Sequence, residues 1–263
     1  MIRLRRILNL RVVAIALYLA IMATIIWASW AGAQRMGYNW QWYRVPQYLY
    51  TLSDDGFQPG ELLIGLWASV KLSTAAFALA VVLGGAIAML RLSGLIVGRG
   101  LAAVYLELIR NIPLLVLLYL FYYVLGPIFG LDRWGAAIIT LAIFHSALIS
   151  EIFRAGINSV APGQWEAAAA IGMSRGQAFR HIIIPQSVRF MLPPLTGEVV
   201  HLIKSSAIVS VIAVAELTTV GRNIISDTYM SFEIWFTVAA VYLVLTLLLS
   251  FGVSVLERRF KTG

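Results

Sequence analysis

Six charged side chains lie within or near long apolar runs of this 263-residue chain: Lys71, Glu107, Arg110, Glu151, Glu198 and Lys204. A charge in the hydrocarbon of a bilayer costs several kcal/mol unless it is paired or faces a water-filled cavity. Each of these residues is therefore a candidate for function until a partner explains its charge.

Lys204 is the strongest candidate for substrate binding. It lies deep in an apolar run that begins at Leu195, and Ser205 and Ser206 follow it. Its ammonium reaches the membrane surface only with strain from that depth, so we expect a polar cavity around it. An ammonium beside hydroxyls suits a carboxylate, the group that every free amino acid carries. Lys71 strengthens the site if it faces the same cavity; the alternative is that it extends to the outer headgroups.

Two carboxylates have a basic residue three positions later on the same predicted helix face. Glu107 precedes Arg110, and Glu151 precedes Arg154. Side chains at this spacing are neighbours on a helix, so we expect two structural ion pairs.

Glu198 and the histidines also have structural explanations. Glu198 lies one turn into its run, where hydration or Arg189 on the cytoplasmic side would satisfy it. His145, His181 and His201 are scattered without the spacing of metal ligands or of a paired nucleophile, so we interpret them as structural. The alternative is an ion-coupled secondary carrier, with the carboxylates inside the runs as proton or sodium sites.

The sequence predicts a protein that is not an enzyme. No Gly-Lys-Ser or Gly-Lys-Thr follows a glycine-rich turn, which argues against a Walker P-loop. The chain has no cysteine, which excludes a thiolate metal site and a thiol nucleophile. We therefore expect no catalytic residues, no metal and no cofactor, and any ATP would be bound by a partner subunit.

The apolar runs must position these residues. The hydrophobic fraction is 60% and the charged fraction 12%, which is typical of a polytopic membrane protein. Six runs are long enough to cross a bilayer, at 12–31, 62–90, 101–125, 135–153, 195–214 and 234–255. Arginines concentrate at alternate ends, which places both termini and the 157–190 loop in the cytoplasm. The fold class is thus all-α, with about six transmembrane helices in contact with lipid. Because the net charge of +8 is spread over these ends, nucleic acid is not an expected partner.

The first 60 residues form two predicted segments. Residues 1–33 are an N-terminal transmembrane anchor; the small residues at 31–33 leave a cleavable signal peptide as the alternative. Residues 34–60 are an extracytoplasmic segment rich in Trp and Tyr, which fits an aromatic belt at the outer interface. A platform that stacks a ligand is the alternative for this second segment.

The cytoplasmic loop carries signals for two short helices. Pro162 suits the first position of a helix, Glu166 follows in its opening turns near the positive end of the dipole, and Gly172 can end it. Ser174 and Gln177 have the spacing of a capping box that opens the second helix.

Three prolines follow these helices. We expect Pro185 to interrupt the second helix, and Pro193 and Pro194 to mark the entry to the next span. Arg175 and other basic residues give the loop an amphipathic character, so it is predicted to be a docking surface.

The loop resembles the EAA loop of ABC-importer permeases. The resemblance lies in Glu166-Ala167-Ala168, in Gly172 and in the Ile184-Pro185 pair, and it continues through 107–113, 151–156 and 214–217. It is similar to the polar-amino-acid permeases in particular and covers roughly residues 61–260, which we take as the permease domain.

The resemblance implies a type I ABC importer permease fold in a bacterial cytoplasmic (inner) membrane. It also implies ABC ATPase subunits, an extracytoplasmic amino-acid-binding protein and a second permease copy or paralogue as partners. The loop would be the coupling helix that contacts the ATPase, with the contact residues Glu166, Ala167, Ala168, Gly172, Ser174 and Arg175.

The resemblance also bears on the substrate. Such permeases often have Lys-Asp-Thr-Ser where this chain has Lys204-Ser205-Ser206. Loss of the acidic residue leaves a net positive field, which disfavours cationic amino acids. The predicted function is therefore ATP-driven import of polar, acidic or amide L-amino acids, with substrate held by Lys204, Ser205, Ser206 and Lys71.

Overall fold

A computed structural model describes residues 2–53 and 56–261 of the chain. The chain divides into two compact units, residues 1–42 and residues 43–263. The first unit is mainly the helix α1 (Ile2–Arg35), whose part Val12–Arg35 is apolar enough to cross a membrane. The predicted helix at the N-terminus is therefore present, and its role as a retained anchor stays a prediction.

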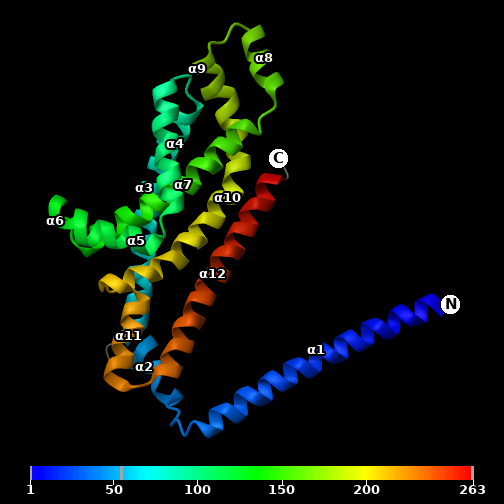
Figure 1. Ribbon diagram of the computed structural model, residues 1–263, viewed down its shortest axis with the longest axis vertical. Helices are drawn as coiled ribbons and strands as arrows, with labels where there is room; N and C mark the ends of the chain where they lie inside the picture. The colour runs from blue at the N-terminus through cyan, green and yellow to red at the C-terminus, as the bar shows by residue number, and fades with distance from the viewer. Residues whose placement is uncertain (1, 54–55, 262–263) are drawn as a thin grey trace. The chain divides into compact units, whose positions relative to one another are not determined.

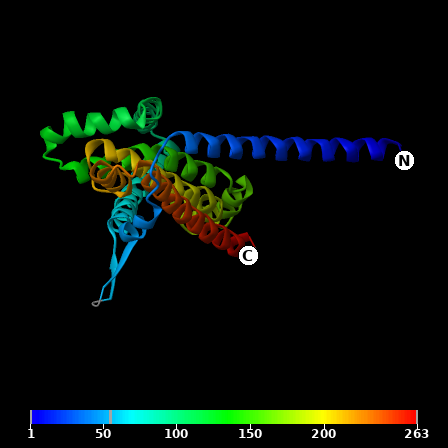
Figure 2. The same cartoon turned by 90° about the horizontal axis from the view of Figure 1, so that it is seen from below.

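The second unit begins with small elements before its first long helix. The 3-10 helix η1 (Trp42–Arg44) and α2 (Pro46–Leu49) lead into the antiparallel strands β1 (Tyr50–Ser53) and β2 (Gly56–Pro59). Both strands are exposed along their length, and the hairpin projects from the rest of the unit in Figure 2.

The remaining elements are helical. They are α3 (Glu61–Leu92), α4 (Ile96–Asn111), α5 (Leu114–Tyr119), the π-helix η2 (Leu120–Leu125), α6 (Gly126–Phe129), α7 (Arg133–Asn158), α8 (Pro162–Ala170), α9 (Arg175–Ala178), the π-helix η3 (Phe179–Ile183), α10 (Ile184–Ser206), the 3-10 helix η4 (Ala207–Ile212), α11 (Leu217–Thr228) and α12 (Ser231–Lys261).

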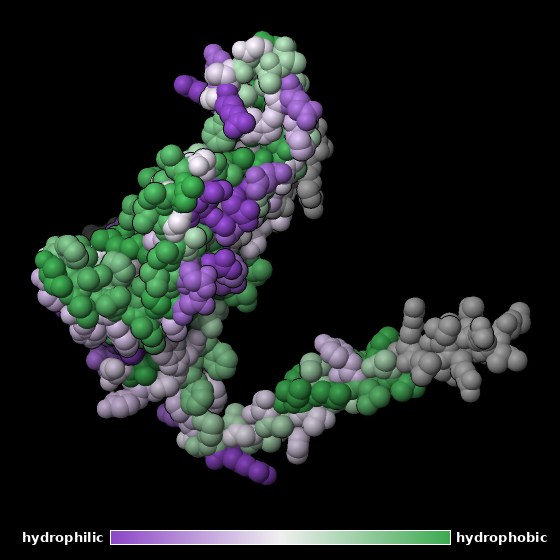
Figure 3. Space-filling view, turned by 45° about the horizontal axis from the view of Figure 1, so that its top comes forward, coloured by the Kyte–Doolittle hydropathy of each residue, from purple (hydrophilic) through white to green (hydrophobic). Residues whose placement is uncertain are grey.

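The helices of the second unit run between two ends (Figure 1). The short helices α8 and α9 lie at one end, and α11 and α2 lie at the other. The centre is apolar: Leu72 and Ala76 of α3 pack with Leu141 of α7 and Leu202 of α10, all with at most 1% of their surface exposed. On the face shown in Figure 3, hydrophobic side chains cover much of the flank, and hydrophilic ones lie both at the end with α8 and α9 and in a group midway along the molecule.

Over the described residues, five helices are long and apolar enough to span a membrane, or six if one bent pair is counted as a span. The predicted span over 101–125 is bent, because α4 and the segment Leu114–Phe129 meet at 105°, so the two are one broken span or a re-entrant segment. Ile112 is extended there, with φ −96° and ψ 126°, because the following Pro113 disfavours the helical region for the residue before it.

The prolines after the loop do not divide the helix as predicted. Arg175–Ile212 is one candidate span, with Pro185 in the first turn of α10 and Pro193 and Pro194 inside it. The π-helical turn η3 directly precedes Pro185, and this local change of hydrogen bonding accommodates a residue that has no N–H.

Candidate functional site

The cytoplasmic loop is built by local signals that the sequence carries. Pro162 is the first residue of α8, as predicted. At the other end Gly172 has a left-handed φ of +79°. The Gly172 N–H donates to the Ala169 carbonyl at 3.0 Å and the Met173 N–H to the Ala168 carbonyl at 3.0 Å, which is the Schellman arrangement. The prediction that Gly172 ends this helix is confirmed.

The second loop helix has the predicted capping box. The Gln177 N–H donates to Ser174 Oγ at 3.3 Å, and the Ser174 N–H donates to Gln177 Oε1 at 2.9 Å. Both ends of the Gly172–Ser174 connection are therefore fixed by local hydrogen bonds rather than by distant contacts.

The loop has a buried side and an open side. Ala168 and Ala178 are buried, and the rings of Trp165 and Phe179 stack with centroids 6.3 Å apart. Gln186 Nε2 donates to Gln164 Oε1 at 3.0 Å and ties α8 to α10. Of the predicted contact residues only Ala168 is buried; the exposed ones are Glu166, Ala167, Gly172, Ser174 and Arg175.

A cavity of about 650 Å³ opens beside these helices. Its lining includes Trp165, Glu166, Arg175 and Phe179 from the loop and Leu92 from the end of α3. Within the described part of the chain, the side chains of Glu166 and Arg175 have no hydrogen bond or ion pair. The loop therefore presents a firm surface with unsatisfied charges of both signs.

Lys204 lies near the C-terminal end of α10 and is exposed. Its side-chain ammonium has no hydrogen bond or ion pair to any described residue. Ser205 is half-buried, whereas Ser206 is buried and donates its hydroxyl to the Ile203 carbonyl at 2.8 Å. The structure thus leaves the ammonium of Lys204 available and uses the Ser206 hydroxyl within the helix.

The structure does not join Lys71 to Lys204. Lys71 Nζ lies 6.0 Å from the ring centroid of Trp67, one turn earlier on α3, and that ring is 61% exposed. This is a cation–π arrangement. Whether Lys71 lines a substrate path stays a prediction.

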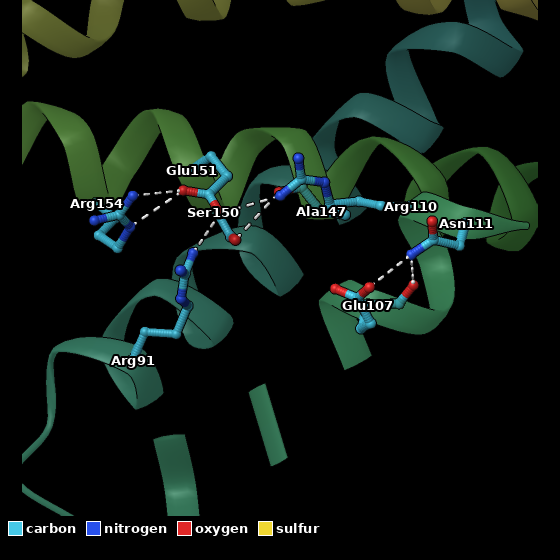
Figure 4. A network of polar contacts seen from close by, with 8 residues as sticks. All are labelled: Arg91, Glu107, Arg110, Asn111, Ala147, Ser150, Glu151 and Arg154. Carbon is cyan, nitrogen blue, oxygen red and sulfur yellow. Dashed lines mark hydrogen bonds and ion pairs between the residues drawn. The ribbon is translucent and has the colours of Figure 1, made fainter. Parts of the chain in front are cut away.

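Glu151 is the centre of an arginine cluster (Figure 4). It lies 2.6 Å from Arg91, 2.9 Å from Arg154 and 3.6 Å from Arg110, so one carboxylate joins α3, α4 and α7. The predicted pair of Glu151 with Arg154 is confirmed. The predicted pair of Glu107 with Arg110 is wrong, because Arg110 reaches across to α7 while Glu107 accepts a hydrogen bond from Asn111 at 3.1 Å.

Glu198 was expected to face the cytoplasmic side near Arg189, and this is also wrong. Glu198 is 8% exposed and lies 2.5 Å from Nδ1 of His145, which is 1% exposed. Arg189 instead lies over the ring of Phe190, 5.0 Å from its centroid. The face of α10 that bears Glu198 is turned toward α7, and the charge has a buried partner there.

Glu216 is a buried carboxylate that the sequence reasoning missed. A loop is expected at 216–233, because this stretch lies between the predicted runs 195–214 and 234–255. It instead contains α11 and the start of α12, and Glu216 is fully buried as the N-cap of α11. It accepts from the N–H groups of Thr218 and Thr219 at 2.9 and 2.8 Å and from the Tyr242 hydroxyl at 2.9 Å. The Ser69 hydroxyl donates to it at 3.3 Å. Glutamate is not among the residue types preferred at N-caps, so no local signal marked this role.

A bundle of apolar helices, interrupted by an ordered and exposed pair of short helices, defines a multi-pass membrane protein. The family described as "Binding-protein-dependent transport system inner membrane component" matches residues 80–262. The chain belongs to this family of inner-membrane transport subunits, and the resemblance to ABC-importer permeases is confirmed.

Named relatives agree with this assignment. The chain is 40% identical over 199 residues to the probable glutamine ABC transporter permease protein GlnM of Bacillus subtilis, covering 75% of this chain and 92% of the relative. It is 39% identical over 168 residues to the glutamine transport system permease protein GlnP of Escherichia coli, covering 63% and 77%. These relatives are permease subunits rather than enzymes.

Solved structures show the same fold. The crystal structure of an amino acid ABC transporter with histidines matches at 41% identity with a TM-score of 0.71, over 76% of this chain and 94% of that one. The inward-facing MetNI methionine ABC transporter matches at 19% identity with a TM-score of 0.65, over 76% and 95%. The predicted type I ABC importer permease fold is confirmed.

Proposed function

We propose that this chain is the permease subunit of an ABC importer that moves polar amino acids into the cytoplasm, driven by ATP hydrolysis on a partner. The observation that carries the proposal is the exposed loop of α8 and α9, held by two backbone caps and placed between α7 and α10. A loop of this kind can receive a displacement from a partner and pass it to both helices without unfolding. Relatives named as glutamine permeases support an amino acid as the cargo.

The proposed partners follow from the role of an ABC importer permease. ABC ATPase subunits would contact Glu166, Ala167, Gly172, Ser174 and Arg175, with Ala168 packed beneath them. The chain supplies no cofactor site of its own in this proposal, and ATP is bound by the ATPase. An extracytoplasmic binding protein would deliver substrate, and a second permease copy or paralogue would complete the path. Both termini would be cytoplasmic, with residues 1–33 as an anchor, 34–60 outside and 61–260 as the permease domain.

The substrate proposal is an acidic or amide amino acid held by Lys204. Its ammonium is exposed and has no partner among the described residues, so it can bind a substrate carboxylate. Ser205 supplies a hydroxyl in place of a carboxylate, which leaves no anion beside Lys204 in the sequence for a cationic side chain. Ser206 and Lys71 remain secondary candidates. The Ser206 hydroxyl already donates to a backbone carbonyl, and the Lys71 ammonium lies over the ring of Trp67.

Uptake into proteoliposomes tests both the ATP-driven transport and the proposed substrate. The chain is reconstituted with its candidate ATPase and binding protein, and labelled glutamate, glutamine and arginine compete, with ATP present or absent on the ATPase side. ATP-dependent uptake of glutamate or glutamine that resists ionophores supports the function. Uptake without ATP that ionophores abolish would instead establish the ion-coupled carrier. ATP-driven arginine uptake would overturn the substrate proposal alone.

Lys204→Met tests the substrate site. Loss of a hydrogen bond between charged groups weakens binding by about 1.5–3 kcal/mol, so the concentration for half-maximal uptake should rise about tenfold to a hundredfold. Lys204→Arg should recover part of this loss. His201→Met is the matched control, because His201 is exposed on the same helix. Unchanged uptake and specificity in Lys204→Met would remove this residue from the site.

A further inference from the structure

We propose that the buried pair of His145 and Glu198 is a positioning link that makes α7 and α10 move as one unit, and so carries the displacement of the loop to Lys204. The inference rests on the proposed function and adds to it residues that touch neither substrate nor ATPase. These two residues are positioning residues because they act through the helix that bears Lys204.

The pair is a directional contact between α7 and α10. Nδ1 of His145 lies 2.5 Å from Oε1 of Glu198, and the two residues are 1% and 8% exposed. His145 Nε2 is also buried and has no partner among the described residues, so the Glu198 contact is the polar bond that holds this ring. Apolar contacts are non-directional and allow two helices to slide, whereas separating a buried hydrogen-bonded pair leaves an uncompensated polar group.

A second close contact joins the same helices nearer to the loop. A Cβ placed on Gly156 of α7 would lie 2.4 Å from Cγ of Met191 on α10, so the Met191 side chain packs directly against the α7 backbone at this glycine. Gly156 and His145 are eleven positions apart on α7, which is about 16 Å along the helix. The two contacts together prevent the helices from pivoting about a single point.

The connectivity then gives a route from the loop to the candidate substrate site. α8 begins four positions after Asn158, the last residue of α7, and η3 continues directly into α10. Lys204 follows Glu198 by six positions on α10, or about 9 Å of helix. A displacement of the loop therefore acts on both helices, and the pair fixes their register just before Lys204.

The test uses the reconstituted transporter and the double substitution His145→Leu with Glu198→Leu. Replacing a buried ion pair by apolar side chains is often close to neutral for folding, so the thermal midpoint should stay within about 5 °C. Uptake should fall, and the ATP hydrolysed per amino acid imported should rise about 2- to 30-fold, the range for altered coupling between sites. Glu198→Gln keeps an oxygen that can accept from Nδ1, and it should stay near the wild-type ratio. Tyr242→Phe is the matched control, because it removes a buried polar contact of α12 with Glu216 that lies outside the α7–α10 interface.

The link is overturned if the double variant hydrolyses as much ATP per imported amino acid as the wild type. It is also overturned if this ratio rises in Glu198→Gln or in Tyr242→Phe as much as it does in the double variant. A measurement that needs no transport separates this result from the proposed function. The chain has no cysteine, so spin labels can be placed at the partly exposed Leu148 of α7 and at the exposed His201 of α10. The distribution of label distances should be broader in the double variant than in the wild type without nucleotide; equal widths overturn the link even if uptake proves to be driven otherwise.

Discussion

Gly172→Ala should loosen the end of α8 without removing any side-chain contact. Gly172 has φ +79°, and a Cβ at this position would meet nothing within 4 Å. The penalty is therefore conformational: the left-handed region costs a residue with a Cβ about 1–2 kcal/mol. A cost of this size changes a population by a factor of about 5–30.

Amide hydrogen exchange measures this change directly. The N–H groups of Gly172 and Met173 close the Schellman arrangement with Ala169 and Ala168, so they exchange only when this end of the helix opens. In the alanine variant their exchange should be about 5–30 times faster. The stimulation of ATP hydrolysis by liganded binding protein should fall in the same variant, because the proposed docking surface is then less often formed.

Gly163→Ala is the matched control within the same helix. Gly163 lies in the first turn of α8, its φ is not positive, and a Cβ there also meets nothing within 4 Å. Alanine at this position should slow exchange or leave it unchanged, because alanine is the better helix former. At Gly172 the exchange of these N–H groups should become faster from Asn to Ala to Val, because these residues tolerate the left-handed region less and less in this order. Equal exchange in the two alanine variants, or faster exchange with Asn than with Ala, would refute the conformational reasoning.

Three further pairs of substitutions test contacts between the helices by thermal unfolding in detergent. Glu216→Ala should destabilise the protein by about 3 kcal/mol or more, because it removes an N-cap and leaves buried donors unpaired, whereas Ser69→Ala should cost about 1 kcal/mol. Gly84→Ala should cost about 1–3 kcal/mol, because its Cβ would lie 2.9 Å from the Ser146 carbonyl, whereas Gly85→Ala meets Phe153 at an ordinary 3.5 Å and should be near neutral. Glu151→Gln should lower the midpoint more than Arg154→Gln does, because it leaves three arginines without their shared anion.

Each of these comparisons has an outcome that contradicts it. If Ser69→Ala costs as much as Glu216→Ala, the carboxylate is not the centre of that network. Equal effects at Gly84 and Gly85 would mean that α3 and α7 can separate freely at this level. A larger effect of Arg154→Gln than of Glu151→Gln would show that the arginines are satisfied elsewhere.

The local features of this protein follow from its sequence. Pro162, Gly172 and the Ser174–Gln177 capping box determine where α8 and α9 begin and end, because each acts on backbone groups within a few residues. The apolar runs likewise predict most of the candidate spans, because the length and hydropathy of a run do not depend on its neighbours. The six residues proposed for the coupling contact rest on a local motif as well, and their role stays a prediction.

The partners of the buried charges could be learned only from the tertiary structure. Spacing along the chain paired Glu107 with Arg110, but Arg110 lies near Glu151 of another helix. Glu198 was expected to be hydrated, yet it is bonded to His145, 53 positions earlier. Glu216 was placed in a loop, yet it joins α3, α11 and α12. A helix can turn a charge toward any of several neighbours, and only the packing of those neighbours fixes which one it meets.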